Sequence, residues 1–406
     1  MIDNDLDSND ALRHIRSQFS LPEGIIYLDG NSLGPLPSKA KARAIEVVEK
    51  QWGEDLITSW NKHNWINLPS IVGDKIGAIV GAEKGQIVSC DSISVNLFKA
   101  LSAALKLNPS RKVIATTRDN FPTDIYMVQG LIDLLGDEYT VRYLDEQDIE
   151  GLLCDDIAVL MLTQVNFRSG FKLDMASITD SAHDKGILML WDLAHSAGAF
   201  PVELDACNVD FAVGCTYKYL NGGPGAPAFI YVASKHQSTY KQPLSGWMGH
   251  NAPFAFSPDY ESPNTIKQNL CGTPGIVSMS ILDAALSIFD DIDVKDVAEK
   301  SEALQAHFIT CMERHDIFNA FEFASPNVEV RGSQLAFRHK HAYAICQAWI
   351  ASGVIADFRA PDILRVGFAP LYLRFDDIRV AVEKLASIMN EKTYLNEEFQ
   401  QKLHVT

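Results

Sequence analysis

A carboxylate, an imidazole, a phenol and an amine follow two neighbouring apolar segments of the chain. Asp192 and His195 come directly after the segment ILMLW, and Tyr217 and Lys218 come after DFAVG. Each residue alone has an ordinary structural explanation, because strand-end carboxylates often cap turns, histidines often fill structural positions and lysines beside aromatic rings usually extend to water. The combination is much rarer. It offers a nucleophilic amine together with groups that can move protons.

Further functional groups follow two other apolar segments. Phe121 comes shortly after VIATT, and Thr163 comes directly after IAVLML. From about residue 85 to 235, short apolar runs alternate with helical stretches, which predicts a mostly parallel sheet in a three-layer α/β/α domain. Ligands of such sheets bind beyond the carboxyl ends of the strands. We therefore expect all of these side chains to meet at one edge of the sheet.

This set of groups suits pyridoxal 5'-phosphate, a flat, phosphorylated heteroaromatic aldehyde. Lys218 would bind its aldehyde carbon as a Schiff base, and Asp192 would keep its pyridine nitrogen protonated. Phosphate binds well at a helix N-terminus, where backbone N–H groups point outward. The segment DSISVNLFKALSAAL (91–105) has the pattern of such a helix, with Ser92 or Ser94 near its start.

The segments outside the predicted sheet indicate further parts of the molecule. Residues 240–275 are rich in Gly, Pro, Ser and Asn and are predicted to form a functional loop region. A long helical stretch, IVSMSILDAALSIFDDI, and further α/β elements then predict a smaller C-terminal α/β domain. The predicted division is an N-terminal arm and helix that belong to the small domain (1–60), a large cofactor-binding domain (61–275) and the C-terminal small domain (276–406).

Composition argues against several classes of function. The chain of 406 residues has a net charge of −17 and no basic run, so nucleic acid and anionic membranes are poor partners. Its seven scattered cysteines lack CxxC spacing, which predicts neither a disulfide framework nor a metal site. The acidic N-terminus does not resemble a signal peptide, and no apolar run approaches the ~20 residues of a membrane span. We expect a cytoplasmic protein.

A set of motifs, in order along the chain, resembles the kynureninase family. The motifs are YLDGNSLGPLP, NFPTD, WDLAHSAGAF, GCTYKYLNGGPG and PLSGWMGH, and the similarity runs from about Tyr27 to Tyr372. Related aminotransferases and desulfurases share the Asp and the Lys, whereas the ordered set is specific. The resemblance implies a fold-type I pyridoxal phosphate-dependent transferase fold. It also implies a hydrolase that cleaves kynurenine, and 3-hydroxykynurenine, to anthranilate, or 3-hydroxyanthranilate, and alanine in tryptophan catabolism.

The resemblance assigns roles to residues at matching positions. Lys218 would carry the cofactor and Asp192 would pair with its ring nitrogen, and we add Tyr217 as a catalytic proton donor or relay. The other cofactor contacts that it implies are Ile93, Ser94, Phe121, Asp124, Thr163, His195, Trp247 and Thr273. Of these, Trp247 and Thr273 would reach the cofactor of the partner subunit. The expected assembly is therefore a homodimer with shared active sites.

Three further positions are assigned to the substrate by the same resemblance. Arg365, in ILRVGFAPLY, would hold the substrate α-carboxylate, a task that suits the two-pronged guanidinium group. Trp65 and the pair Gly272 and Thr273 resemble the bacterial branch of the family, which favours kynurenine over its 3-hydroxy form.

Two alternative functions stay open from the sequence. A cysteine desulfurase or selenocysteine lyase would need a thiolate on a mobile loop upstream of Arg365, and WIASGVIADFRAPDILR contains no cysteine. Cys346 lies in the helical stretch AYAICQAWI, where a buried structural thiol is expected. A catalytically silent binding protein is expected to lose Lys218, Asp192 or Arg365, and all three are present.

Overall fold

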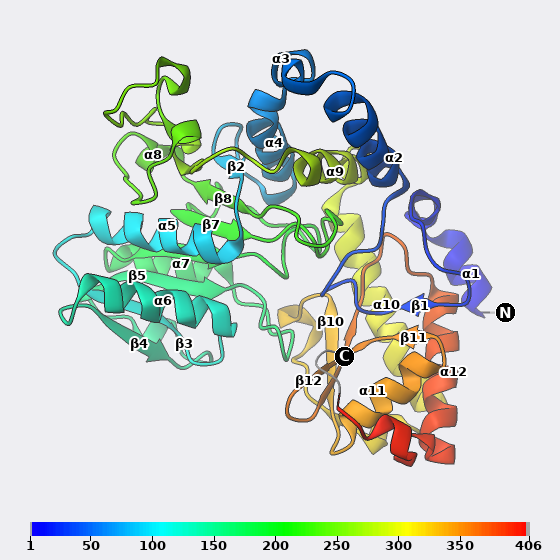
Figure 1. The fold of residues 1–406 in the computed structure, drawn as a ribbon. Coiled ribbons are helices and arrows are strands. Elements are labelled where there is room, and N and C mark those ends of the chain that lie inside the picture. Colours follow the sequence, from blue (N-terminus) through cyan, green and yellow to red (C-terminus); the bar gives the residue numbers. More distant parts are fainter. Residues whose placement is uncertain (1, 403–406) are drawn as a thin grey trace.

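A sheet of seven strands lies at the centre of one half of the molecule, within the part of the chain that the structure describes (Figure 1). This computed structural model describes residues 2–402, so the outermost residues of the two predicted terminal segments, 1 and 403–406, lie outside it. The strands are β2 (Ile87–Ser89), β3 (Val113–Thr117), β4 (Thr140–Leu144), β5 (Ile157–Thr163), β6 (Leu188–Asp192), β7 (Phe211–Gly214) and β8 (Phe229–Val232). Their order is β2–β8–β7–β6–β5–β3–β4, and only β8 runs antiparallel to its neighbours.

Helices cover both faces of this sheet, which becomes the middle of three layers. They are α4 (Leu68–Val80), α5 (Ile93–Leu107), α6 (Pro122–Leu135) and α7 (Met175–Asp184). Val159 and Met161 of β5 share a core with α5 and α6. Leu160 and Leu162 share the opposite core with α4 and α7, because successive side chains of a strand point to opposite faces.

A second sheet, in the order β12–β13–β10–β9, lies in the other half of the molecule. Its strands and helices are β9 (Glu322–Phe323), β10 (Gln334–Arg338), β12 (Asp357–Arg359), β13 (Ile363–Gly367), α10 (Val294–Arg314), α11 (Ala342–Ala351) and α12 (Phe375–Glu391). The N-terminal part of the chain joins this half, because β1 (Ile26–Tyr27) pairs with β11 (Val354–Ile355). The Asp7 carboxylate also accepts N–H groups at the start of α12. The three-part domain division stays a prediction.

The strands that carry the predicted chemistry are present. Those that precede Phe121, Thr163, Asp192 and Lys218 are β3, β5, β6 and β7, so the predicted α/β class with a mostly parallel sheet is confirmed. The sequence analysis does not predict β2 and β4. β2 has only three residues, and β4 is an edge strand with one fully buried position, so neither gives a strong apolar run.

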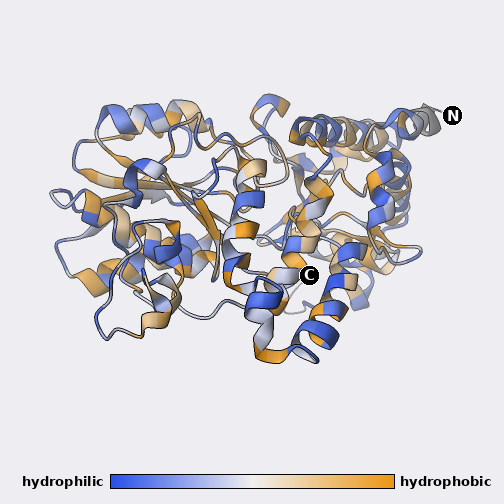
Figure 2. Cartoon of the chain, turned by 90° about the horizontal axis from the view of Figure 1, so that it is seen from above, coloured by the Kyte–Doolittle hydropathy of each residue, from blue (hydrophilic) through white to orange (hydrophobic). Residues whose placement is uncertain are grey.

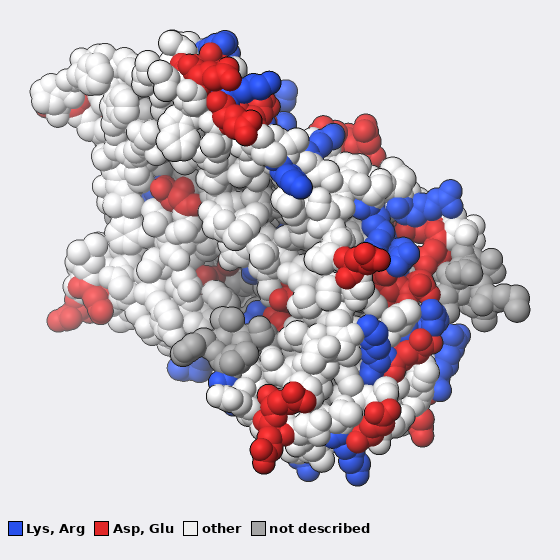
Figure 3. All heavy atoms as spheres, turned by 45° about the vertical axis from the view of Figure 1, so that its right-hand side comes forward, with Lys and Arg blue, Asp and Glu red and all other residues white. Residues whose placement is uncertain are grey.

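The surface of the molecule carries both signs of charge on the face drawn in Figure 3. Figure 2 shows apolar residues along the central strands and helices striped with polar and apolar residues. On the face drawn in Figure 3, Lys and Arg side chains are interspersed with Asp and Glu and form no continuous basic patch. Between residues 2 and 402, no helix combines the length and the apolar character needed to cross a bilayer.

Candidate active site

The carboxyl edge of the seven-stranded sheet borders a cavity of ≈ 230 Å³. Segments that follow β3, β5, β6 and β7, together with the start of α5, contribute its walls. The predicted site residues that line it are Ile93, Ser94, Phe121, Asp124, Thr163, Asp192, His195, Tyr217 and Lys218. The parallel topology therefore brings together the residues that the strand-end argument selects.

The amine of Lys218 lies beside the imidazole of His195. Lys218 Nζ is 3.0 Å from His195 Nε2. Burial lowers the pKa of His195 well below its ordinary value, and the positive charges of Lys218 and Arg365 lower it further. The imidazole is therefore neutral at pH 7, so Nε2 can accept a hydrogen bond from the amine. His195 Nδ1 is buried without a hydrogen-bond partner.

Two buried carboxyl groups, Asp124 and Asp192, lie in the same wall. Asp192 Oδ1 accepts the N–H of Ala194 at 2.7 Å, and Asp124 Oδ2 accepts the hydroxyl of Thr163 at 3.2 Å. Burial and the neighbouring Asp192 charge raise the pKa of Asp124 well above its ordinary value. Burial also raises the pKa of Asp192, whereas the Lys218 charge and the Ala194 N–H lower it. The proton of this pair therefore belongs on Asp124, and Asp192 is the anion.

These groups fit the pyridoxal phosphate that the sequence predicts. Asp124 Oδ1 and His195 Nδ1 are buried polar atoms without partners, and such atoms in a cavity wall indicate a missing ligand. The ring of Phe121 is 43% exposed and meets Phe167 edge-on at 5.2 Å, which leaves a ring face for stacking. Ser92 caps α5 by accepting the N–H of Val95, and the first N–H groups of a helix are free to bind a phosphate.

Arg365 lies next to the cavity rather than in its lining. It is buried on β13, and its guanidinium group binds the Asp357 carboxylate through Nε (3.0 Å) and Nη2. Nη1 donates to the carbonyl of Phe167 at 2.6 Å, and Nη2 also donates to Ser32 Oγ at 2.8 Å. Phe167 itself lines the cavity, so Arg365 lies behind that wall. A substrate carboxylate must share or displace some of these contacts.

Besides Arg365, four further predicted residues lie outside the lining of this cavity. Trp65 is buried and donates from Nε1 to Gln51 Oε1 at 2.8 Å. Trp247 is 43% exposed, and Gly272 and Thr273 are exposed in the loop region. The roles of all four stay predictions, and three of the four are on the surface, where a partner subunit could reach them.

Two residues that shape the site, Asn120 and Asp357, are not among the predicted ones. Asn120 Oδ1 accepts the N–H of Phe121 at 2.7 Å and the hydroxyl of Thr163, so it joins the ends of β3 and β5. Asn120 does not cap α6, which begins at Pro122 after the N-cap residue Phe121, so no local signal in the sequence points to that role. Asp357 lies opposite Arg365 in the β12–β13 pairing. A hairpin register drawn through the Pro-containing turn of DFRAPDILR would have identified this pair.

Comparisons with known proteins support the interpretation of this cavity as a pyridoxal phosphate site. The kynureninase of Burkholderia pseudomallei (strain 1106a) is 48% identical over 407 residues, and that of Pseudomonas fluorescens is 44% identical over 407 residues. Each alignment covers 99% of this chain and 98% of the relative. The chain belongs to the kynureninase family. A family description, the kynureninase C-terminal domain, matches residues 297–385.

Solved structures confirm the fold-type I architecture expected of a kynureninase. The apo structure of a cysteine desulfurase from Thermococcus onnurineus NA1 has a TM-score of 0.77 at 17% identity and covers 93% of this chain and 98% of that chain. A C-DES variant with glycine covalently linked to its PLP cofactor has a TM-score of 0.79 at 15% identity, with 91% and 98% covered. At these identities the likeness concerns the fold alone.

Cys346, the cysteine next upstream of Arg365 in this kynureninase family member, does not provide the thiolate that a desulfurase needs. Cys346 has no exposed surface, and its thiol points to the carbonyl of Ala356 at 3.5 Å. Burial, together with the charges of Asp357 and Asp29, raises the pKa of this thiol, so it does not supply a thiolate at neutral pH. The thiol is a structural group inside α11.

Proposed function

We propose that this chain is a pyridoxal phosphate-dependent hydrolase that cleaves L-kynurenine, and also 3-hydroxy-L-kynurenine, to anthranilate, or 3-hydroxyanthranilate, and L-alanine. The observation that carries the proposal is the grouping of Lys218, the neutral His195 and the anionic Asp192 around one cavity. Identities of 48% and 44% to kynureninases support the choice of reaction. When bound, the cofactor supplies an electron sink for the α-carbon of the substrate.

Lys218 and Asp192 would perform the two tasks that the cofactor requires of the protein. Lys218 would hold the aldehyde carbon until the amine of the substrate displaces it. Its released amine, 3.0 Å from an uncharged imidazole, can then act as the base that removes the α-proton. Asp192 would keep the ring nitrogen protonated, and Asp124 supports this role by holding the proton that would otherwise neutralise Asp192.

Tyr217 would act as a proton donor. Burial raises its pKa, and the neighbouring Cys215 and Asp192 raise it further, so the phenol keeps its proton at neutral pH. In the reaction, water adds to the γ-carbonyl carbon and the bond between the β- and γ-carbons breaks. The β-carbon must then gain a proton to become the methyl group of alanine. Tyr217, whose ring centroid is 6.0 Å from Lys218 Nζ, can supply or relay that proton.

Arg365 would bind the substrate α-carboxylate. Asp357 holds its guanidinium group in a fixed orientation, which lowers the entropy lost when a second carboxylate binds. Trp65 and Gly272 would shape the substrate site, with kynurenine preferred over the 3-hydroxy form. Their places outside the cavity lining mean that this assignment rests on the resemblance to the bacterial branch.

The active form would be a homodimer in the cytoplasm that serves tryptophan catabolism, and through it NAD biosynthesis. Trp247, Phe254 and Phe256 form an exposed aromatic cluster, with Trp247 5.6 Å from Phe254 between ring centroids. Phe254 and Phe256 are 60% and 75% exposed. Apolar clusters of this kind are typical of contact surfaces. The cluster contains Trp247, which is predicted to reach the partner's cofactor.

One assay tests the proposed reaction. Purified protein loaded with pyridoxal phosphate is mixed with L-kynurenine, and fluorescent anthranilate and alanine are measured. We expect equal amounts of the two products. Loaded protein that releases no anthranilate contradicts the proposal, and release of alanine and sulfide from cysteine, in the presence of a thiol reductant that supplies the two electrons, would support the desulfurase instead. Sedimentation of the loaded enzyme tests the dimer, because a monomer with full activity contradicts shared sites.

A further inference from the structure

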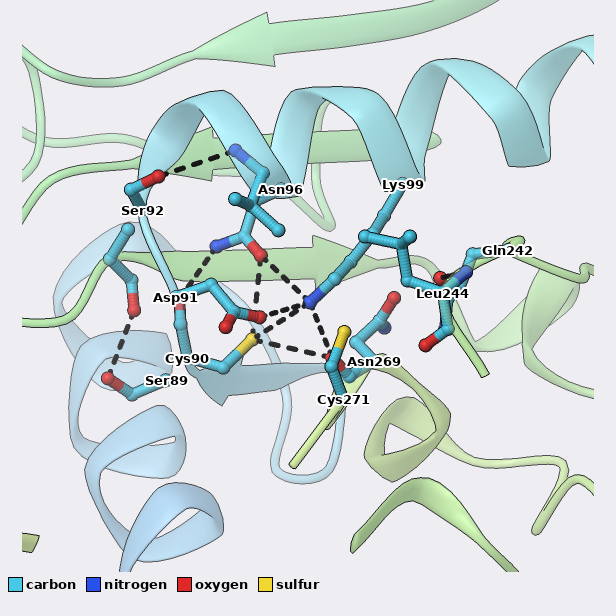
Figure 4. A network of polar contacts seen from close by, with 12 residues as sticks. Ser89, Cys90, Asp91, Ser92, Asn96, Lys99, Gln242, Leu244, Asn269 and Cys271 are labelled. Atoms are coloured by element: carbon cyan, nitrogen blue, oxygen red, sulfur yellow. Dashed lines mark hydrogen bonds and ion pairs between the residues drawn. The ribbon is translucent and has the colours of Figure 1, made fainter. Parts of the chain in front are cut away.

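Lys99 is a fully buried cation on α5, inside a network of polar groups (Figure 4). Its Nζ donates to the carbonyl of Asn269 at 2.6 Å and binds the carboxylate of Asp91. Asn96 Oδ1 lies 3.4 Å from Nζ, and Cys90 Sγ lies 3.8 Å from it. A lysine is almost never fully buried unless it is paired. Burying the charge of Lys99 therefore costs free energy, and we expect a role of Lys99 to offset that cost.

Asp91, the ionic partner of Lys99, is next to the expected phosphate site. Its backbone is left-handed, with φ of 49°, and it comes directly before Ser92, which caps α5. Asp91 lines the cavity together with Ser92 and Ser94. An unpaired carboxylate at this place would repel a phosphate bound at the helix N-terminus, because like charges within a few ångströms destabilise each other.

The other partner of Lys99, Asn269, belongs to the loop region. The side chain of Gln242 donates to the carbonyls of Leu244 (3.0 Å) and Gln268 (2.9 Å), which joins the two ends of this region. At Gly246 the backbones touch, since a Cβ atom there would lie 1.5 Å from the carbonyl oxygen of Cys271. The loop region is therefore one packed unit, and Lys99 connects it to the start of α5.

We propose that Lys99 is a positioning residue that neutralises Asp91 and ties the phosphate-binding start of α5 to the loop region. Lys99 does not touch the cavity, so it acts on the cofactor only through Asp91 and the backbone that Asp91 leads into. This inference rests on the proposed function, since it concerns the phosphate group of the same cofactor. It adds a requirement that the catalytic groups do not show: Asp91, the acid beside the phosphate site, needs Lys99 as a buried counterion.

The charge state of Lys99 agrees with this role. Burial lowers the pKa of Lys99, whereas Cys90 and Asp91 raise it, and the net direction is upward. Burial raises the pKa of the Cys90 thiol to about 12, so this sulfur stays protonated at neutral pH. The ion pair with Asp91 is therefore the charged contact of Lys99 at neutral pH.

The test compares two cofactor forms on the purified apoenzyme. Lys99→Met removes the charge and keeps the chain length, and Lys106→Met, at an exposed position of the same helix, is the matched control. Dissociation constants are measured by absorbance for pyridoxal phosphate and for pyridoxal, which lacks the phosphate. We expect Lys99→Met to weaken pyridoxal phosphate by a factor on the order of ten or more, since charged hydrogen bonds are lost, and to leave pyridoxal unchanged. Lys106→Met should change neither constant.

A second variant separates charge from folding. In Asp91→Asn combined with Lys99→Met no buried charge is left unpaired, and Asn tolerates the left-handed backbone at position 91. We expect this double variant to recover most of the affinity for pyridoxal phosphate. The proposal would be overturned if Lys99→Met weakened the binding of pyridoxal phosphate and of pyridoxal by the same factor, or if it weakened neither. It would also be overturned if the double variant recovered no affinity for pyridoxal phosphate. Wild-type protein that binds neither form would instead overturn the proposed function.

Discussion

Asp192 and Asp210 are buried carboxyl groups at opposite ends of adjacent strands, and their surroundings differ completely. Asp192 ends β6 at the cavity, where one backbone N–H and the carboxyl group of Asp124 face it. Asp210 comes directly before β7, at the amino edge of the sheet. It accepts hydrogen bonds from His183 Nε2 and His236 Nε2, both at 2.7 Å, and from the N–H of Met189 at 2.8 Å.

The groups around Asp192 and Asp210 determine the direction in which the pKa of each carboxyl group shifts. Burial raises the pKa of Asp192, and few donors oppose it. Burial would raise the pKa of Asp210 as well, but the hydrogen bonds from His183, His236 and the Met189 N–H lower it far below its ordinary value. The comparison shows how to recognise a site: the Asp210 carboxylate at the amino edge has its partners inside the chain, whereas Asp124 Oδ1 and His195 Nδ1 at the carboxyl edge have none.

The largest effect is expected for Lys218→Ala, which removes the nucleophile from the carboxyl edge. Turnover of kynurenine should fall by roughly 10⁴- to 10⁶-fold, the scale of losing a nucleophile. Stability should change little, because the structure shows one hydrogen bond for this amine, to His195. Anthranilate release and thermal unfolding of the loaded enzyme measure the two quantities. Retained borohydride-sensitive absorbance in the variant would contradict the role of Lys218.

Asp192→Asn should be the next most damaging change to activity. Without the anion, the ring nitrogen loses the negative charge that would keep it protonated, and kcat should fall by roughly 10²- to 10⁴-fold. The variant should be as stable as the wild type or more so, because a neutral amide avoids the burial cost that raises the pKa of Asp192. Turnover and the urea midpoint of the same preparation test this. A large loss of stability with normal turnover would reverse the proposed contrast with Asp210.

Tyr217→Phe should reduce kcat by a smaller factor, on the order of 10²-fold, because only one proton transfer loses its donor. Burial and neighbouring groups keep the phenol protonated, so the variant loses a donor and not a base. Steady-state turnover of kynurenine measures the effect, and unchanged cofactor absorbance serves as the control. Turnover within a few-fold of wild type would remove Tyr217 from the mechanism.

The contrast between the two edges also shows what the sequence can predict. The residues after β3, β5, β6 and β7 were predictable because parallel strands bring their carboxyl ends together whatever the loops do. The pairing of Lys99 with Asn269, 170 positions away, was not, since it depends on how the loop region packs on α5. The same holds for Arg365, whose type fits a carboxylate but whose partners, the Phe167 carbonyl among them, come from distant segments.

The smallest effect on turnover is expected at the amino edge, with Asp210→Asn. This variant should keep kcat for kynurenine unchanged, because Asp210 does not line the cavity. It should lose about 2–3 kcal/mol of unfolding free energy at neutral pH, the scale of charged hydrogen bonds to a buried carboxylate. Urea unfolding and kynurenine turnover test both parts. Lost turnover with unchanged stability would show that Asp210 belongs to the site.

The loss of unfolding free energy in Asp210→Asn should depend on pH. The folded-state pKa of Asp210 is lowered, so its stabilisation is fully present above the unfolded-state pKa of about 3.9 and declines as the pH falls below it toward the folded-state pKa. The wild type should therefore lose its advantage over Asp210→Asn below about pH 4. Urea midpoints of both proteins across this range measure the gap. A gap that stays constant into acid would mean that the Asp210 carboxylate contributes through shape and not through charge.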